Sequence, residues 1–429
     1  MYKLKSGILL VVTLCLFTSV AIGQASKSPF TSRGIGDIND MGLIHNKGMG
    51  GVGVSNGTPW NINNLNPALL PYNSLTIFTA GFLGEYREIS NETTSETNSG
   101  GNLSYLVISL PIKPGKWTSS LGLMPYSNVD YTNSYYSSVA NTSDSVRALT
   151  TSTGSGGFNQ LYWSNGVALN KNFSVGLKIT YLFSSIEREL NNTIEGFSDG
   201  VSYTPNLLTR TSVSDFMFSG GVAFRKDSIF NNRIRFNAGI TYDLKANVKA
   251  KRYIATEQLV GNQAAIADTL SYERGEIVLP QALTAGFSFT NGYKWTAGVD
   301  VKLQQWSDFR NFSGSDDGMK NSYRVAVGGE FTPDYASVNS YLKRVTYRLG
   351  LSYENTPYVL PNPETGEQVT DLGINFGWSL PVGRLSSLDF AFKVGKRGSI
   401  SDNTIEEDYY QVTLGFNFND QWFIKRKYD

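Results

Sequence analysis

The residues of this chain that could do chemistry are few. Gly48, Gly50 and Gly53 fit the G-x-G-x-x-G pattern of dinucleotide-binding loops. That pattern holds a pyrophosphate only where it joins a strand to a helix within a βαβ unit, because the helix N-terminus then faces the phosphates. The surrounding sequence supplies no such unit, so we expect no nucleotide site.

The sequence also offers few residues for acid–base, redox or metal chemistry. His45 is the only histidine, and Cys15 is the only cysteine. A hydrolase generally needs a histidine base beside a serine or aspartate, whereas His45 stands alone in a glycine-rich stretch. A single cysteine inside an apolar N-terminal stretch forms no disulfide framework and no lipid anchor. We therefore expect no enzyme, no catalytic residues, no metal and no cofactor.

The charge balance also excludes a class of partner. The formal net charge is +1, with 37 basic and 36 acidic residues spread along the chain. Nucleic-acid binding requires a basic face or tail, and neither is present. We expect no nucleic-acid partner.

The elements that position the remaining polar residues are strands. In 173–183, apolar residues alternate with polar or small ones, so one face would be apolar and the other polar. The apolar set is Phe173, Val175, Leu177, Ile179, Tyr181 and Phe183. The same alternation places Leu349 outward and Arg348 inward in a later strand.

Fourteen such strands are predicted, an even number, as bacterial single-chain barrels require. Their ranges are 74–83, 103–112, 117–126, 158–169, 173–183, 214–224, 233–245, 281–289, 294–304, 322–331, 345–354, 371–380, 387–396 and 409–418.

The connectors between these strands alternate long and short. Long ones include 127–157, 184–213 and 246–280, whereas short ones include 113–116 and 170–172. Outer-membrane barrels have long external loops and short periplasmic turns, whereas a soluble sandwich or propeller has no reason to sort its loops by parity. The fold class predicted is all-β, a 14-stranded antiparallel transmembrane β-barrel. One connector at the short-turn end, 332–344, breaks the rule and has no explanation in the sequence.

The N-terminal region divides into two parts. Lys3 and Lys5 precede an apolar stretch that ends at small residues before Gln24, which predicts a signal peptide over 1–23. Residues 24–72 lack strand alternation and are too few for an ordinary independent domain. They form either a hatch inside the barrel or a disordered tail; apolar Leu69 and Leu70 favour the hatch. The barrel would then cover 73–429.

Several motifs resemble one known family. Gly48-Met49-Gly50-Gly51, followed by Asn66-Pro67-Ala68, is similar to the glycine-rich N-terminus and Asn-Pro-Ala motif of FadL-type proteins. These outer-membrane proteins import long-chain fatty acids and other hydrophobic compounds. Stretches 279–309 and 323–334 are similar to the second half of that family.

The resemblance implies a fold and a route. The family has a 14-stranded barrel, an N-terminal hatch, an interior ligand pocket, and a side exit at a kink in the third strand. Pro125 is the candidate for that lateral opening, because proline donates no ladder hydrogen bond; in the plainer interpretation it simply ends the strand. Arg324 and Arg348 are candidate lumen contacts for a carboxylate, since a guanidinium offers a fork of donors. Inward charges could instead pair with one another.

Two functions follow from the resemblance. The first is passive uptake of long-chain fatty acids or other hydrophobic small molecules, with lateral release into outer-membrane lipid. The second is a barrel that transports nothing and acts as a subunit or shuttle of a larger outer-membrane complex, as in type IX secretion or an assembly machinery. Its polar connectors Ser90–Asn102 and Asn141–Gly157 could then contact other outer-membrane proteins.

Overall fold

The structure is a computed structural model that describes residues 26–138, 147–195, 204–229, 234–260, 263–360, 366–382 and 386–420. The predicted signal peptide at 1–23 lies outside these residues. No helix in the described ranges is long and apolar enough to cross a membrane.

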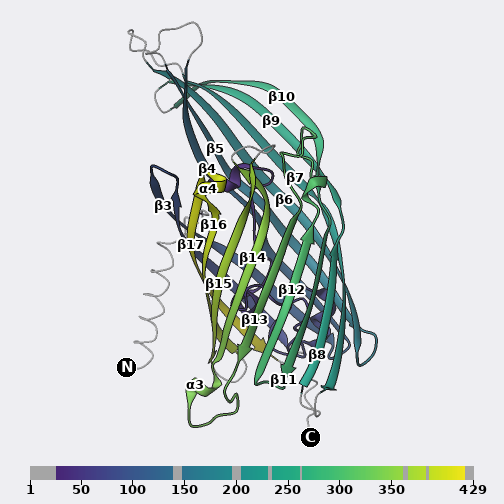
Figure 1. Cartoon of the computed structure of the whole chain (residues 1–429). Helices are drawn as coiled ribbons and strands as arrows, with labels where there is room; N and C mark the ends of the chain where they lie inside the picture. Colours follow the sequence, from purple (N-terminus) through teal and green to yellow (C-terminus); the bar gives the residue numbers. More distant parts are fainter. Residues whose placement is uncertain are drawn as a thin grey trace, which may run out of the picture.

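Antiparallel strands make up most of the molecule and close into a barrel (Figure 1). The first barrel strand, β2, pairs with the last, β17, from Thr76↔Asp420 to Ser90↔Glu406. The barrel strands are β2 (Thr76–Ser90), β3 (Ser95–Lys113), β4 (Trp117–Ser138), β5 (Arg147–Ala168), β6 (Phe173–Glu195), β7 (Thr204–Ile229), β8 (Ile234–Asp243), β9 (Ala246–Val260), β10 (Gln263–Leu279), β11 (Ala282–Asn291), β12 (Trp295–Gln304), β13 (Ser322–Phe331), β14 (Thr346–Leu360), β15 (Glu367–Val382), β16 (Ser386–Ser399) and β17 (Ile405–Asp420).

The predicted count of fourteen is confirmed. Strand β9 continues the line of β8 after a short break, and β10 leads into β11 through Pro280 and Gln281. Below the break β8 pairs with β11, and above it β9 pairs with β10 and with the upper part of β7. Each of these two interrupted strands therefore crosses the barrel once. Pro280 fits such a break because it has no N–H to give to a ladder.

The long connectors were predicted as loops, and this prediction is wrong for most of their length. Strands β4, β5, β6, β7, β9 and β10 continue far past the rest of the barrel and form a tall curved sheet at one end (Figure 1). Ser90–Asn102 contains the first residues of β3, and the described part of Asn141–Gly157 belongs to β5. Beyond a membrane both faces of a strand meet water, so the alternation that marks a strand fades.

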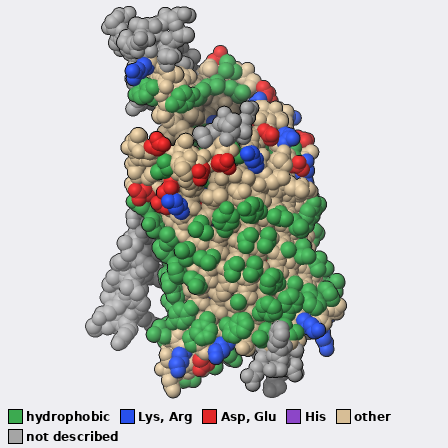
Figure 2. Space-filling view, viewed as in Figure 1, with side chains coloured by type: hydrophobic (Ala, Val, Ile, Leu, Met, Phe, Trp, Pro, Cys, Tyr) green, Lys and Arg blue, Asp and Glu red, His purple; other side chains and the backbone are tan. Residues whose placement is uncertain are grey.

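The outer face of the lower barrel is apolar. Figure 2 shows a broad band of hydrophobic side chains, with charged side chains gathered above it and at the lower rim. Leu349, Leu351 and Val327 are among its exposed members. A barrel that crosses lipid presents this kind of surface.

The residues before β2 lie inside the barrel (Figure 1) and are called the hatch here, residues 26–72. They fold as η1 (Pro29–Ser32), β1 (Asp37–Ile38), α2 (Ile44–Lys47) and η2 (Pro67–Tyr72). Further short helices are η3 (Trp306–Asp308), α3 (Tyr341–Arg344) and α4 (Ile400–Asn403). Between β13 and β14 the chain makes its long turn at the short-turn end, where α3 lies.

Leu349→Arg tests which face meets lipid. Leu349 is 56% exposed, one turn of the alternation above the lower end of β14 and within the apolar band, and a charge on the lipid face costs up to ~2–4 kcal/mol, most at mid-depth. We expect loss of the heat-modifiable folded band on gels. Lys302→Met, on the lumen side of β12, is the control and should still fold. Arg348→Leu would be a poor control, because Arg348 forms an ion pair with Glu330. Equal folding of both variants would contradict this facing.

Candidate functional site

The hatch backbone lies directly on glycines of the barrel wall. Met49 is fully buried beside Gly328 of β13 and Gly350 of β14, which are cross-strand partners. A Cβ atom at Gly328 would lie 2.1 Å from the Met49 carbonyl oxygen, and one at Gly350 would lie 2.1 Å from the Met49 carbonyl carbon. Any side chain at either glycine would therefore push the hatch away from the wall.

A second contact of the same kind holds Asn66-Pro67-Ala68. A Cβ atom at Gly176 of β6 would lie 2.3 Å from the Pro67 carbonyl carbon, and one at Gly221 of β7 would lie 2.2 Å from Asn66 Oδ1. Asn66 caps η2, because its Oδ1 accepts a hydrogen bond from Ala68 N at 3.0 Å. Its Nδ2 donates to the Val54 carbonyl at 2.8 Å. The Asn-Pro-Ala motif therefore begins η2 and packs its main chain against the glycines of β6 and β7.

Gly50 and Gly51 join the hatch to Arg324. Both glycines have positive φ, 72° and 93°, which L side chains rarely adopt. The turn brings the Gly50 carbonyl to Arg324 Nη2 at 3.1 Å, and the same nitrogen donates to Asp40 Oδ2 at 2.8 Å. Burial raises the pKa of Asp40, but Arg324 and Lys47 lower it by more, so it lies well below its ordinary range.

The structure places Arg348 at a different spot in the lumen. Its Nε donates to Glu330 at 3.1 Å and its Nη1 donates to Ser379 Oγ at 2.6 Å. The pKa of His45 in the hatch is lowered to about 3, mainly because the imidazole is buried and also because Arg348 is positively charged. Both candidate carboxylate contacts, Arg324 and Arg348, are thus engaged with groups of the protein itself.

A larger charge cluster was missed in the sequence. Arg87 of β2 pairs with Glu407 of β17, while Arg397 of β16 lies 2.8 Å from Asp37 of the hatch and 2.9 Å from Asp371. The cluster ties β1 to the wall at the end opposite the short turns. Of the wall residues only Asp371 lies within a predicted strand. The other three lie just beyond the predicted strand ends, and nothing in the sequence pairs any of them with Asp37.

The central cavity of the lumen is small and has both polar and apolar lining residues. It measures about 140 Å³ and is lined by charged groups that include Lys178, Lys302, Asp243 and Asp300. Asp300 accepts hydrogen bonds from the Gly53 and Val54 amides at 2.7 and 2.8 Å. The described residues contain no cluster of histidine, cysteine or acidic side chains that could hold a metal ion.

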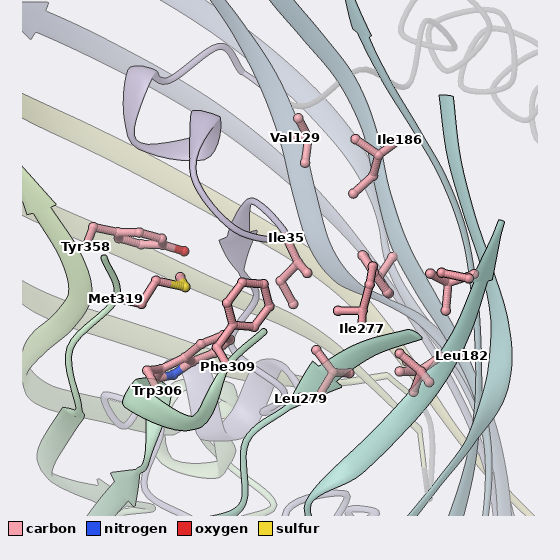
Figure 3. Close-up of a cluster of buried hydrophobic side chains, with 14 of the residues drawn as sticks. Ile35, Val129, Leu182, Ile186, Ile277, Leu279, Trp306, Phe309, Met319 and Tyr358 are labelled. Carbon is pink, nitrogen blue, oxygen red and sulfur yellow. The ribbon is translucent and has the colours of Figure 1, made fainter. Parts of the chain in front are cut away.

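Apolar side chains of the hatch and of the wall pack together in the upper part of the lumen. Figure 3 shows Ile35 of the hatch facing Phe309 and Trp306, which lie on the connector between β12 and β13. Val129, Ile186 and other residues of the tall strands complete this apolar cluster. It is packed by the protein's own side chains.

The barrel wall has a gap between β3 and β4. Their pairing runs from Lys113↔Trp117 to Leu106↔Leu123 and stops there, although both strands continue. Above that point the hatch strand β1 pairs with β4, at Asp37↔Asn128 and Ile38↔Ser127. A cavity of about 520 Å³ lies beside the gap.

Pro125 lies at this gap. The register between β4 and β5 shifts between Pro125 and Ser127, so Tyr126 is an extra residue of the bulge type. The plainer interpretation, in which the strand ends at Pro125, is wrong because β4 continues to Ser138.

Comparison with known proteins now gives the family. The BamG family profile matches residues 4–429. The chain belongs to the BamG family. No curated protein sequence matches it.

Solved structures share the fold of this BamG-family chain. The toluene transporter TbuX of Ralstonia pickettii superposes with a TM-score of 0.57 at 14% identity, over 89% of this chain and 100% of the other. The CymD monoaromatic hydrocarbon channel gives 0.57 at 14% identity, over 90% and 99%. A FadL homologue of Pseudomonas aeruginosa gives 0.55 at 13% identity, over 89% and 98%. The FadL-type fold implied by the motifs is therefore confirmed.

Gly350→Ala tests the hatch contact. The added methyl would overlap the Met49 main chain, so we expect the hatch to leave its place and the folded protein to melt at lower temperature. Limited proteolysis within 26–72 reads this out directly. Gly220→Ala is the matched control, because its Cβ would meet nothing closer than 4.0 Å. Identical digestion patterns for both variants would refute the contact.

A pH series tests the burial of His45. The pKa of His45 is lower in the docked hatch than the ordinary 6.5, so the undocked state binds more protons between pH 6.5 and about 3. Docking should weaken as the pH falls through this window. The melting temperature of His45→Gln should fall less steeply than that of the wild type over the same range. Parallel curves would count against a buried neutral imidazole.

Proposed function

We propose that this barrel takes up hydrophobic small molecules and releases them sideways into the outer membrane. The observation that carries the proposal is the gap between β3 and β4. In a transmembrane barrel such a gap joins the lumen to lipid, because the unpaired strands leave the wall open there. The names of the structural neighbours, a toluene transporter and a monoaromatic hydrocarbon channel, support this substrate class.

The route would start at the apolar cluster and end at the gap. Val129 belongs to the cluster and also lines the cavity beside the gap, together with Leu103 and Leu123. An apolar ligand gains ~0.8 kcal/mol per buried methylene along such a surface. Because β1 covers the gap from inside, passage requires the hatch strand or its neighbours to move.

Long-chain fatty acids are the finer proposal within this class. Their carboxylate needs a donor, and Arg324 or Arg348 would have to exchange its present partner for it. Arg324 is the better placed of the two, since it lines the central cavity. Asp40 would lose its ion pair in that exchange, so charged ligands should bind more weakly than uncharged hydrocarbons of equal size.

Deletion of Tyr126 tests the route. Removing the extra residue lets β4 run in regular register with β5, which should straighten the strand and narrow the gap. We expect uptake of radiolabelled hexadecanoic acid and toluene by intact cells to fall at least tenfold. Tyr126→Ala keeps the extra residue and should stay within twofold of the wild type.

Two results would overturn the proposal. The first is a wild-type protein that confers uptake of neither compound in a host lacking it. The second is equal uptake by the deletion and Tyr126→Ala, provided that both fold and reach the membrane. In that case the gap would have no part in passage.

A second candidate function is a subunit of a larger outer-membrane complex. The specific observation is that the hatch and packed side chains occupy much of the lumen, while the tall sheet of β4 to β7, β9 and β10 (Figure 1) rises above the hydrophobic band of the outer face (Figure 2). A barrel with an occupied lumen and a large exposed sheet is better suited to binding another protein than to passing small molecules. Purification in mild detergent, with mass spectrometry of bound proteins and lipophiles, separates the two: a stoichiometric partner on an empty barrel supports the subunit, and bound apolar compounds on a monomer support uptake.

A further inference from the structure

A second large cavity opens at the short-turn end of the barrel, under the hatch. It measures about 340 Å³ and is called the mouth cavity here. Its wall includes Trp60 of the hatch, Tyr293 and Lys294 of the β11–β12 turn, and Tyr335 and Arg344 of the β13–β14 turn. In the outer-membrane orientation proposed above, this end faces the periplasm, and the cavity lies far from the gap.

Aromatic rings line one side of the mouth cavity in a continuous row. The ring centroids of Trp60 and Tyr293 are 4.8 Å apart, and those of Tyr293 and Tyr335 are 5.1 Å apart. The Trp60 carbonyl accepts hydrogen bonds from the side-chain amides of Asn417 and Asn419, at 2.9 and 3.1 Å. The row therefore has a fixed position before anything binds to it.

The β13–β14 turn that carries Tyr335 is the connector that breaks the length rule. It is held in shape by side chains, because the Tyr341 hydroxyl donates to the Pro381 carbonyl at 3.1 Å and the Tyr347 hydroxyl donates to the Leu342 carbonyl at 3.2 Å. Even so, Val338 is 95% exposed and Leu342 is 67% exposed. A preformed turn that holds apolar side chains in water is typical of an interaction surface.

The charges of the mouth cavity leave a positive surplus. Arg235 pairs with Asp227, and Arg348 pairs with Glu330. Lys294 and Arg344 line the same cavity and form no ion pair with any described residue. A complementary ligand would therefore carry negative charge.

The cavity also holds unused hydrogen-bonding groups. Arg344 Nε and Asn417 Oδ1 are buried atoms without a hydrogen-bond partner among the described residues. One is a donor and the other an acceptor, and a peptide backbone supplies both a carbonyl and an N–H. A lipid acyl chain supplies neither.

We propose that the mouth cavity and the β13–β14 turn bind an acidic, extended segment of another protein. An apolar or aromatic side chain of that segment packs against the row of Trp60, Tyr293 and Tyr335, and its carboxylates face Lys294 and Arg344. A protein fits better than a membrane surface, because the cavity lies at the mouth of the lumen and is lined by the hatch, by turns and by residues of β8 and of β11 to β17. The inference gives the second candidate function a contact surface and does not depend on ligand passage.

The test uses the full-length protein in nanodiscs and fluorescence anisotropy. The probe is a fluorescein-labelled peptide of alternating aspartate and phenylalanine; a lysine–phenylalanine peptide and an aspartate–serine peptide are its comparisons. We expect the acidic aromatic peptide to bind at least tenfold more tightly than either. Arg344→Glu and Lys294→Glu should each weaken its binding at least tenfold. Lys171→Glu is the matched control, since it makes the same charge change in the 169–172 turn outside the cavity, and it should stay within twofold.

Three results would overturn the proposal. One is equal binding of the basic peptide, and another is equal weakening by Lys171→Glu, which would indicate only diffuse attraction. The third is competition by vesicles containing phosphatidylglycerol as effective as competition by unlabelled peptide, which would assign the surface to lipid headgroups. Uptake of hexadecanoic acid by Arg344→Glu should remain within twofold of the wild type, so failure of this proposal and failure of the uptake proposal are distinguishable.

Discussion

Direct contact between the main chain of the hatch and the main chain of the barrel wall is the constraint on which the rest of this structure depends. At Gly328 and Gly350, and again at Gly176 and Gly221, a Cβ atom would overlap the hatch. Close packing of two backbones fixes their separation far more tightly than contact through side chains does, because no rotamer can adjust. The hatch therefore has one position, and the ion pair of Arg324 and the small central cavity follow from it.

That position also explains how the lumen tolerates so many buried charges. An unpaired buried charge is costly, whereas a paired and hydrogen-bonded one is tolerated. Asp40 meets Arg324, and Asp37 meets Arg397, so hatch carboxylates neutralise cations of the wall. Removing the hatch would expose these cations to one another across the lumen. The hatch and the barrel thus behave as a single electrostatic unit.

The strand count and the facing of the wall could be predicted because lipid imposes a period of two on every crossing strand. The continuation of β4 to β7 beyond the membrane could not be predicted, because water on both faces of a strand removes the alternation of apolar and polar residues. The site was predicted in part. Asn66 and Gly50 were singled out by their motifs, but the partner of Arg324 is 284 residues away, and no local pattern relates such positions. The sequence showed that the turn at 332–344 is longer than the other connectors at its end of the barrel. That it exposes apolar side chains became clear only from the structure.

The hatch contacts strands from both halves of the ring, β5 to β8 on one side and β13 to β17 on the other, and β2 can complete the ring only by pairing with β17. The first segment to be made therefore acquires its final neighbours only when the last segment is present. Contacts so distant along the chain must be closed against a large loss of chain entropy, which makes assembly slow. Until the ring closes, the N-terminal glycine-rich stretch and half of the wall remain exposed, so this barrel has particular need of protection while it is being assembled.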